Sequence, residues 1–371
     1  MRISFFVPRC TPDNSHGRYV IELSKRLGSE CHVTVYAGAF WPLFRPGVHC
    51  RFLPVPIRPA LARLAALWAA SVLAVKRRPA DIVHVQGADA PVGNVVTAHF
   101  CNAAARVAYQ GVGLYGRFNS AIGAAAEKYS MAKSTTRSVI AVSQKVKNEI
   151  EREYGVDPRK VVVIHHGVDA KAFHPTHRAR WSDAVRYRLG LRRDDFVVLF
   201  VGGDYRRKGL VPLLQAAGRV SEPVKVLAVG VKRDASLNRL VQQNGLNKLV
   251  TFLDVTAEIA SLYSAADCFA LPTRYDTFSM ATLEAMASGL PVIVGRTAGV
   301  SELLSPGCDS LVLEKPDDVD LLAQALETLV RDEKLREMLG AEARSTAERH
   351  SWDTVAKQTL AVYRATLMGS P

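Results

Sequence analysis

The sequence predicts an α/β protein with two Rossmann-like domains that follow one another along the chain. Short apolar runs rich in valine and isoleucine alternate with helical patterns, which indicates parallel sheets covered by helices. This alternation occurs in two series, and a polar stretch that ends near Arg193 separates them. The length of 371 residues suits two or three domains. The apolar (48%) and charged (22%) fractions exclude disordered and collagen-like chains.

The first series begins at the N-terminus. Its expected strands are Ile3–Val7, His32–Tyr36, Cys50–Leu53, Asp81–Val85, Val95–Ala98, Ser138–Val142 and Lys160–Ile164. Its expected helices are Gly17–Leu27, Pro59–Arg77, Ala103–Lys133 and Gln144–Tyr154. Ser143 stands directly before the last helix, and we expect it to be the N-cap because its hydroxyl can accept a hydrogen bond from a helix amide.

The second series begins after the polar stretch from Gly167 to about Arg193, which is expected to be the crossing between the domains. Its expected strands are Phe196–Val201, Val224–Val229, Leu249–Leu253, Asp267–Leu271, Pro291–Val294 and Ser310–Leu313, and its last helices are 332–349 and Trp352–Leu367. We expect an N-terminal acceptor-binding domain (1–171), a C-terminal donor-binding domain (172–350) and a C-terminal helix (351–371) that packs back on the first domain. Two facing domains of this kind would form a cleft at the carboxyl ends of their sheets, where such folds bind ligands.

Positive charge is concentrated in the first half of the chain. The formal net charge is +13; residues 1–175 have 23 Lys and Arg against 11 Asp and Glu, whereas residues 176–371 have 25 against 24. Such a half attracts phosphate-rich partners, although a generally basic surface gives the same composition. Nucleic acid is excluded as the favoured partner because finger spacings, basic-region heptads and RNP-type strands are missing.

Two segments suit a membrane surface. Residues 57–78 form an apolar helix with basic flanks, but its uncharged stretch of 12 residues is too short to span a bilayer, and a buried helix is the favoured interpretation. Residues 103–137 mix basic and aromatic side chains as interfacial anchors do, although solvent-facing helix ends look similar. The N-terminus lacks a signal-peptide pattern and the six cysteines form no C-x-x-C pair. We therefore expect a cytoplasmic protein with reduced thiols, peripheral on the inner face of the plasma membrane.

The strongest functional signal is segment 274–293, RYDTFSMATLEAMASGLPVI. It holds two acids eight residues apart, Asp276 and Glu284, across a strand-to-helix turn. A helix that starts between Thr277 and Ser279 would offer unpaired N–H groups to an anion and place Glu284 about two turns along. The two carboxylates could accept hydrogen bonds from sugar or ribose hydroxyls. Alternatively, Asp276 only caps the helix and Glu284 is solvated.

A second segment, 200–210, reads FVGGDYRRKGL. Its strand ends in two glycines that allow close approach of a ligand, and the following cations can neutralise a diphosphate. It is not a P-loop, because the G-x-x-x-x-G-K-[ST] order is absent, and a solvated surface turn also fits. Its candidate ligand-binding residues are Gly203, Arg206, Arg207 and Lys208.

Segment 274–293 resembles the acidic-x7-acidic motif of retaining GT-B glycosyltransferases of family 4, followed by that family's LEAMA-x-G-x-P run. The resemblance implies that Glu284 binds ribose hydroxyls and Asp276 binds hydroxyls of the donor sugar, although the family usually has Glu at the first position. It also implies that the start of the helix faces the sugar and the phosphate, with Thr277, Phe278, Ser279 and Met280 as donor-binding residues.

Other segments extend the resemblance over nearly the whole chain. Segment 203–209 is similar to the family's G-x-x-x-x-R-K-G loop, whose Arg and Lys hold the donor diphosphate. In the first half, His16 and Gly17 stand where the family has a glycine pair near the donor sugar. His99, at the end of the strand Val95–Ala98, matches a family histidine near that sugar, although a lone histidine is more often structural. Segment 166–175 resembles the N-G-V-D…F-x-P linker, with His166 in place of Asn.

The resemblance implies transfer of a sugar from a nucleotide-diphosphate donor with retained anomeric configuration. Segment 203–209 and the basic stretch 103–137 look most like those of lipopolysaccharide-core glucosyltransferases, so the expected donor is UDP-glucose and the expected acceptor a lipid-linked or cell-surface glycan. The departing phosphate would take the acceptor proton, so no general base is assigned. No cofactor and no metal are expected, since no strand ends in Asp-x-Asp and cations would stabilise the leaving group. The expected catalytic residues are His99, Asp276, Arg207 and Lys208.

Four alternatives remain open from the sequence. A GT-B nucleotide-sugar epimerase would use the same donor site without an acceptor. A glycosyltransferase could act on a soluble small molecule. A non-catalytic protein that binds anionic glycans would need only the cations. A dinucleotide-dependent dehydrogenase is disfavoured because G-x-G-x-x-G does not follow the first strand.

Overall fold

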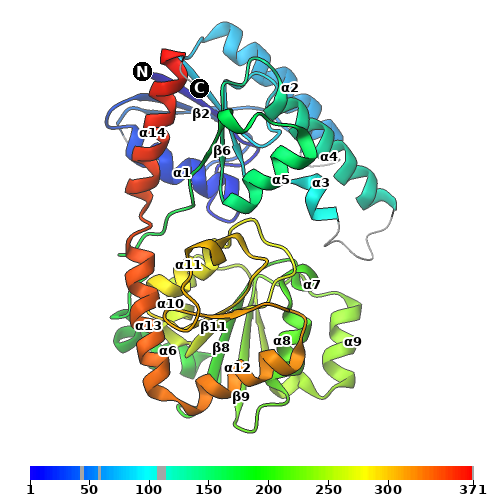
Figure 1. The fold of residues 1–371 in the computed structure, drawn as a ribbon, viewed down its shortest axis with the longest axis vertical. Helices are drawn as coiled ribbons and strands as arrows, with labels where there is room; N and C mark the ends of the chain where they lie inside the picture. Colours follow the sequence, from blue (N-terminus) through cyan, green and yellow to red (C-terminus); the bar gives the residue numbers. More distant parts are fainter. Residues whose placement is uncertain (42–45, 57–59, 107–113, 370–371) are drawn as a thin grey trace. The chain divides into compact units, whose positions relative to one another are not determined.

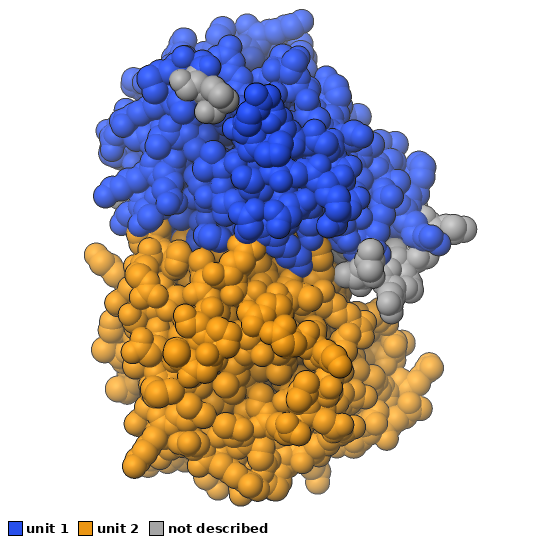
Figure 2. Space-filling model, in the orientation of Figure 1, with its two compact units in different colours: residues 1–166, 352–371 blue, residues 167–351 orange. Residues whose placement is uncertain are grey.

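The computed structural model describes residues 1–41, 46–56, 60–106 and 114–369. The chain folds into two compact units, coloured separately in Figure 2. Unit 1 contains residues 1–166 and 352–371, and unit 2 contains residues 167–351. Each unit is a parallel sheet with helices packed against it (Figure 1), so the predicted fold class is confirmed.

The sheet of unit 1 has seven strands in the order β3-β2-β1-β4-β5-β6-β7. All of its strand pairs are parallel, and β4, β5 and β6 are buried along their whole length. Buried parallel strands require nearly continuous apolar runs, and these runs are the feature from which the strands were predicted. The strands are β1 (Arg2–Phe6), β2 (His32–Ala37), β3 (Val48–Phe52), β4 (Ile82–Gln86), β5 (Val95–Ala98), β6 (Ser138–Ala141) and β7 (Val161–Val163).

The helices of unit 1 follow the prediction except in one region. They are α1 (Ser15–Leu27), α2 (Ala60–Arg77), α3 (Asn102–Ala105), α4 (Leu114–Ala132), α5 (Gln144–Tyr154) and α14 (Trp352–Met368). Ser143 caps α5 as expected, since its Oγ accepts a hydrogen bond from the Val146 amide at 3.1 Å. Of the helix predicted over 103–133, the structure describes α3, which ends at Ala105, and α4, which begins at Leu114; residues 107–113 between them lie outside the described ranges. Residues 57–59 and 107–113 of the two candidate membrane segments lie outside the described ranges.

Helix α14 belongs to unit 1 although it follows unit 2 in the sequence. It packs against α1, where Arg26 Nε lies 2.5 Å from Asp353 Oδ1. Tyr363 reaches the sheet, and its hydroxyl is 2.6 Å from His84 Nδ1 in β4. The C-terminal segment is thereby fixed on unit 1 by an ion pair and a buried hydrogen bond.

Unit 2 has a six-stranded parallel sheet in the order β10-β9-β8-β11-β12-β13. Its strands are β8 (Phe196–Val201), β9 (Val224–Val229), β10 (Val250–Leu253), β11 (Cys268–Leu271), β12 (Val292–Gly295) and β13 (Leu311–Leu313). Its helices are α6 (His177–Arg188), α7 (Tyr205–Lys208), α8 (Leu210–Ala217), α9 (Ala235–Gln243), α10 (Ile259–Ala265), α11 (Met280–Ala287), α12 (Val319–Arg331) and α13 (Glu333–Glu348).

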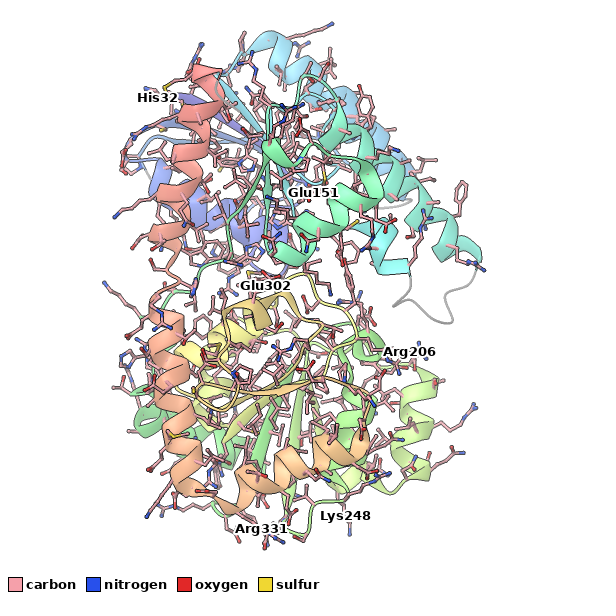
Figure 3. All side chains as sticks on the ribbon, viewed as in Figure 1. His32, Glu151, Arg206, Lys248, Glu302 and Arg331 are labelled. Carbon is pink, nitrogen blue, oxygen red and sulfur yellow. The ribbon has the colours of Figure 1, made fainter. Side chains whose placement is uncertain are left out.

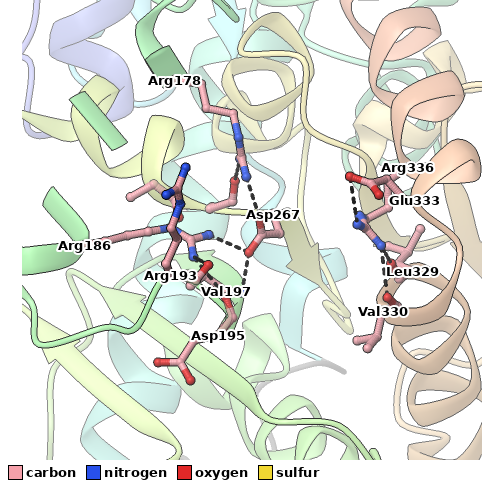
Figure 4. A network of polar contacts seen from close by, with 12 residues as sticks. Arg178, Arg186, Arg193, Asp195, Val197, Asp267, Leu329, Val330, Glu333 and Arg336 are labelled. Carbon is pink, nitrogen blue, oxygen red and sulfur yellow. Dashed lines mark hydrogen bonds and ion pairs between the residues drawn. The ribbon is translucent and has the colours of Figure 1, made fainter. Parts of the chain in front are cut away.

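Helix α6 lies in the polar stretch predicted to be the crossing between the domains, where the sequence analysis named no helix. Polar residues and arginines dominate it, so it lacks the apolar stripe that predicts a helix. Ionic contacts hold it to the sheet instead (Figure 4): Arg186, with 8% of its side chain exposed, lies 2.7 Å from Asp267 Oδ2, and Arg178 lies 2.6 Å from Asp267 Oδ1. Arg186 also donates to the carbonyls of Ala265 and Asp195 at 3.0 Å.

The unit boundaries lie at residues 166/167 and 351/352, and the predicted boundary at 171/172 is corrected by five residues. The physical reason is a backbone pairing within unit 2. The Val168 amide donates to the His350 carbonyl at 2.9 Å, and Val168 forms a parallel bridge with Ser351. Residues 167–171 are therefore attached to the end of unit 2.

None of the helices within the described ranges combines the length and apolarity that crossing a bilayer requires. All six cysteines are thiols; Cys10, Cys31, Cys101 and Cys268 are buried, and Cys50 and Cys308 are exposed.

Candidate active site

In each unit the strand order reverses once, between β1 and β4 and between β8 and β11. Ligands of open α/β sheets bind outside the carboxyl ends of the strands at such a point. His16, at the start of α1, follows β1, and His99 follows β5, the neighbour of β4. Lys208 and Asp276 follow β8 and β11. The predicted site residues thus lie at the expected edge of each sheet.

Lys208 and Asp276 form the centre of the unit 2 cluster. Lys208 Nζ lies 3.1 Å from Asp276 Oδ2, with 17% and 12% of the two side chains exposed. Burial alone would raise the pKa of Asp276, but the charges of Lys208 and Arg207 outweigh it and hold the pKa below its usual value. Asp276 is therefore an ionised, nearly buried carboxylate beside a cation.

Two glycines, Gly202 and Gly209, determine the position of Lys208. A Cβ on Gly202 would lie 2.2 Å from Lys208 Cδ and 2.9 Å from its Cε, so the lysine stem occupies the space that a side chain at 202 would need. Gly209 has φ of 81°, and a Cβ there would lie 1.9 Å from the Pro272 carbonyl oxygen. Only glycine allows α7 to end this close to the chain that leaves β11.

Arg207 joins the two loops of the cluster. Its Nη1 donates a hydrogen bond to the Tyr275 carbonyl, and its Nε lies 3.1 Å from Asp204 Oδ2. The Arg207 carbonyl in turn accepts a hydrogen bond from the Arg274 amide at 2.8 Å. The guanidinium is 14% exposed and is directed at the loop that carries Asp276.

Arg206 and Gly203 lie farther out. Arg206 Nη2 is 3.1 Å from Asp234 Oδ2, and the guanidinium stacks 4.8 Å from the ring of Tyr205. Figure 3 labels Arg206 at α7, and Asp234 is the N-cap of α9. Gly203 is exposed after β8, with its carbonyl accepting from the Lys232 amide at 3.4 Å. The structure therefore separates Arg206 from the Lys208–Asp276 pair.

Helix α11 begins at Met280, slightly later than predicted, and Ser279 is its N-cap. The Ser279 hydroxyl accepts a hydrogen bond from the Thr282 amide at 3.3 Å. With φ of 83°, Ser279 is the one non-glycine residue of positive φ in the described part of the chain. Such strain is concentrated at functional sites in proteins generally.

The amides around the start of α11 have different roles. The Phe278 amide donates to Asp276 Oδ1 at 3.3 Å, so it is already used inside the protein. The amides of Ser279 and Met280 meet no acceptor among the residues that the structure describes. Thr277 is half-buried, whereas the Phe278 ring is buried. Two helix-terminal N–H groups are thus available to an anion beside Asp276.

Glu284 lies just over one turn into α11 rather than two, because the helix starts at Met280. It is 4% exposed, and its Oε2 accepts a hydrogen bond from the Tyr263 hydroxyl at 3.0 Å. The alternative of a solvated Glu284 is therefore wrong. The alternative that Asp276 merely caps the helix is also wrong, because Ser279 is the cap.

The cluster in unit 1 is built around His99. This histidine is 5% exposed, and its ring stacks on that of His16 at 4.4 Å between centroids and on that of His166 at 5.4 Å. Its Nε2 lies 2.8 Å from Gln86 Oε1 at the end of β4. Burial, with smaller effects from neighbouring histidines, lowers the pKa of His99 well below its usual value. His99 is therefore a neutral imidazole near pH 7.

His16 and Gly17 form the first turn of α1. The Asn14 side chain caps this helix by accepting from the Gly17 amide at 2.7 Å. A Cβ on Gly17 would lie 2.5 Å from the carbonyl oxygens of Arg9 and Thr11, so the preceding loop can fold onto the helix only at a glycine. His16 Nδ1 lies 3.5 Å from Asp89 Oδ2, and burial raises the pKa of that carboxyl.

Two residues of the two clusters were missed by the sequence analysis, Gln86 and Tyr263. Gly202 was predicted to allow close approach of a ligand, whereas in the structure it makes room for the Lys208 stem. Gln86 is a polar residue at the end of an otherwise apolar strand, and that position was an available signal. Tyr263 has no comparable signal, because its link to Glu284 depends on the packing of α10 against α11. Among the described residues, no group of three or more His, Cys, Asp and Glu is arranged to hold a metal ion.

Comparison with known proteins gives consistent results for both units. Residues 16–172 match the family described as Glycosyltransferase Family 4, and residues 182–346 match Glycosyl transferases group 1. The D-inositol 3-phosphate glycosyltransferases of Corynebacterium urealyticum and Paenarthrobacter aurescens are each 32% identical, over 58% and 60% of this chain. These alignments cover 54% and 56% of the relatives, so the match spans about half of their length.

Solved structures agree on the fold. The glycosyltransferase WaaG, which is involved in lipopolysaccharide biosynthesis, superposes with a TM-score of 0.84 at 20% identity, covering 97% of this chain and 99% of WaaG. Anabaena HepE, solved in complex with UDP-glucose, superposes with a TM-score of 0.79 at 19% identity, covering 98% of this chain and 100% of HepE. At these identities the likeness shows a common fold.

Proposed function

The chain belongs to the family-4 glycosyltransferases of the GT-B type, and we propose that it transfers a sugar from a nucleotide-diphosphate donor to an acceptor with retention of configuration. The observation that carries this proposal is the Lys208–Asp276 pair, 3.1 Å apart, with Arg207 beside it at the strand reversal of unit 2. Cations and a carboxylate at one point suit a ligand that has both phosphates and hydroxyl groups.

Each residue of this cluster has a proposed role. Lys208 and Arg207 stabilise the charge that develops on the departing nucleoside diphosphate, which accelerates transfer because that charge is largest in the transition state. The amides of Ser279 and Met280 add two further donors. Asp276 accepts hydrogen bonds from the donor sugar, and Glu284 accepts them from the ribose. No metal or cofactor takes part in this proposal.

The proposed roles in unit 1 are fewer. His99 contacts the donor sugar, and the first turn of α1, which contains His16 and Gly17, contacts the sugar and the diphosphate. No side chain is assigned as general base, since the departing phosphate takes the acceptor proton.

A panel of nucleotide sugars tests the activity. The purified protein is screened for thermal stabilisation and for slow donor hydrolysis, with Lys208→Ala in parallel and Lys334→Ala, on α13 of the same unit, as the matched control. We expect at least one nucleotide sugar to be bound and cleaved by the wild type and the control, and not to be cleaved by Lys208→Ala. Equal cleavage by Lys208→Ala, or conversion of the donor to an epimer without acceptor, would overturn the proposal.

We propose UDP-glucose as the donor and a lipid-linked or cell-surface glycan, such as a lipopolysaccharide core, as the acceptor. The support is the fold shared with WaaG and with HepE in its UDP-glucose complex. The curated relatives favour a second candidate, a soluble inositol phosphate acceptor. Measuring transfer from UDP-glucose to each acceptor class distinguishes the two, because each candidate predicts product with only one class.

We further propose peripheral binding to the cytoplasmic face of the plasma membrane through α2 and α4. Four large apolar side chains of these helices are at least half exposed, Leu61, Leu73, Phe118 and Tyr129, and the unit carries the positive charge of the chain. Vesicles with anionic lipid should bind the protein better than neutral ones, and less well in high salt. The double variant Phe118→Ser, Tyr129→Ser should lose this binding, whereas Tyr187→Ser, an exposed aromatic of unit 2, should keep it.

A further inference from the structure

His99 has two ring nitrogens in different surroundings. Nε2 lies 2.8 Å from Gln86 Oε1. Nδ1 is buried and has no hydrogen-bond partner among the residues that the structure describes. A buried polar nitrogen without a partner is costly, so native proteins rarely leave one unless a ligand or water supplies the partner. Gln86 Nε2, the other polar atom of the contact, is also buried without a described partner, but of the two ring nitrogens of His99 only Nδ1 is left to meet a ligand.

The contact with Gln86 determines which nitrogen carries the proton. An amide oxygen can only accept, so Nε2 must donate to Gln86 Oε1 and carry the hydrogen. In a neutral imidazole the other nitrogen is then a hydrogen-bond acceptor. His99 is neutral because of its burial, and Nδ1 therefore presents a lone pair.

The ring is held in this orientation by its neighbours. His16 and His166 both stack on the ring, and the Tyr19 ring meets it edge-on at 4.9 Å. Gln86 is fully buried at the end of β4, so its side chain cannot turn away into solvent. The stacked faces and the hydrogen-bonded Nε2 are occupied, so a ligand can reach His99 only at the edge that carries Nδ1.

We propose that Gln86 is a positioning residue that keeps the His99 proton on Nε2, so that Nδ1 accepts a hydrogen bond from a hydroxyl group of the bound nucleotide sugar. This inference rests on the proposed function for the identity of the ligand. It assigns His99 the role of an acceptor for a sugar hydroxyl and excludes proton donation from Nδ1. Recognition would then require a hydroxyl on the sugar at that point.

The tautomer is tested without any ligand by ¹⁵N NMR of the full-length protein labelled at histidine. Separate nitrogen signals with the hydrogen on Nε2 of His99 are expected in the wild type. In Gln86→Met, which has a similar volume and no acceptor oxygen, we expect a mixture of the two tautomers. In Gln86→Glu, which retains an acceptor oxygen, the Nε2 hydrogen should remain. A hydrogen on Nδ1 in the wild type would overturn the proposal.

The ligand contact is tested with UDP-glucose, or with the nucleotide sugar that the panel selects if UDP-glucose does not bind. Addition should shift the His99 Nδ1 signal in the direction of an accepted hydrogen bond, and one of a set of deoxy-sugar donors should fail to shift it. The kcat/KM of Gln86→Met should fall about 10-fold or more, as expected for loss of one hydrogen bond of about 1.4 kcal/mol. Gln86→Glu should recover most of this loss.

One control variant and two distinct outcomes separate failure of this inference from failure of the proposed function. Ser71→Ala, at a buried polar residue of α2 whose hydroxyl donates to the Trp68 carbonyl of the same helix, should leave the activity and the His99 signals unchanged. If the wild type cleaves no nucleotide sugar, the proposed function fails while the tautomer result stands. If it cleaves the donor but Nδ1 does not respond to it, a bound water is the partner and the inference fails alone.

Discussion

Replacement of Gly202 by alanine tests the position of Lys208 without removing any charge. A Cβ at 202 would lie 2.2 Å from Lys208 Cδ, whereas ordinary carbon contacts are about 3.5–4.0 Å. The lysine stem must therefore move by more than about 1 Å. Displacements of about 1 Å in a catalytic group can lower the rate about 100-fold. We therefore expect the kcat of Gly202→Ala to fall nearly as low as that of Lys208→Ala, although the net charge of the protein is unchanged.

The assay is donor turnover at saturating nucleotide sugar, with thermal unfolding of each variant. The obstructing atoms belong to a flexible side chain, but Gly202 also has φ of 159°, where a side chain strains the backbone, so Gly202→Ala should be less stable than the wild type and still unfold cooperatively. Gly218→Ala is the matched control, since its Cβ would meet Leu246 Cδ2 at 3.3 Å, far from the cluster, and it should keep the wild-type kcat. A folded Gly202→Ala with wild-type kcat would refute the argument that the position of Lys208 matters.

Further predictions concern affinity, pH, stability and metal. Glu284→Gln should weaken donor binding about 10- to 100-fold in calorimetry, because charge-assisted hydrogen bonds are lost, and Tyr263→Phe should weaken it less than 10-fold. If Glu284→Gln bound the donor as tightly as the wild type, Glu284 would have no role in binding the ribose. Burial lowers the pKa of His84 to about 3, below the unfolded value of about 6.5, so the unfolded state binds the extra proton as pH falls. From pH 7 to pH 5 the stability contribution of His84 should fall by about 2 kcal/mol, and His84→Gln should reduce the pH dependence of urea unfolding by that amount; an unchanged dependence would contradict this. Arg186→Met should destabilise unit 2 by about 3 kcal/mol in urea unfolding, since it leaves the mostly buried Asp267 with fewer partners, and unaltered stability would show that the network is dispensable. Chelation with EDTA should leave donor turnover unchanged, and a loss restored by a divalent ion would contradict the cation mechanism.

The strands were predictable because burial on both faces of a parallel sheet demands continuous apolar runs. Val95–Ala98 and Phe196–Val201 match the prediction to the residue. Helix α6 was not predictable from periodicity, because Arg186 holds it in place through polar contacts. Its partners are the Asp195 carbonyl, 9 residues away, and the Ala265 carbonyl and Asp267 carboxylate, about 80 residues away. The sequence alone does not show that these distant residues lie next to Arg186 in the fold.

The site was predictable where residues follow strands. Lys208 and Asp276 each follow a strand, so the strand order of a Rossmann-like sheet brings them together. The role of Gly202 was not predictable, because it depends on how the Lys208 side chain folds back over the preceding loop. The Gln86–His99 contact joins neighbouring strands β4 and β5, and it required the register that pairs Gln86 with Thr97.

The three consecutive cations of α7 differ in what they can offer a diphosphate. Each lies 3.1 Å from a carboxylate: Arg206 from Asp234, Arg207 from Asp204 and Lys208 from Asp276. The cations of α7 are therefore already paired with carboxylates before a donor arrives, which the sequence analysis did not predict. Solvent and salt weaken the attraction within a mostly buried ion pair only slightly, whereas they weaken it strongly within an exposed pair. Arg206, 55% exposed and paired outside the cluster, thus contributes least, and Lys208, held between Gly202 and Asp276, contributes most.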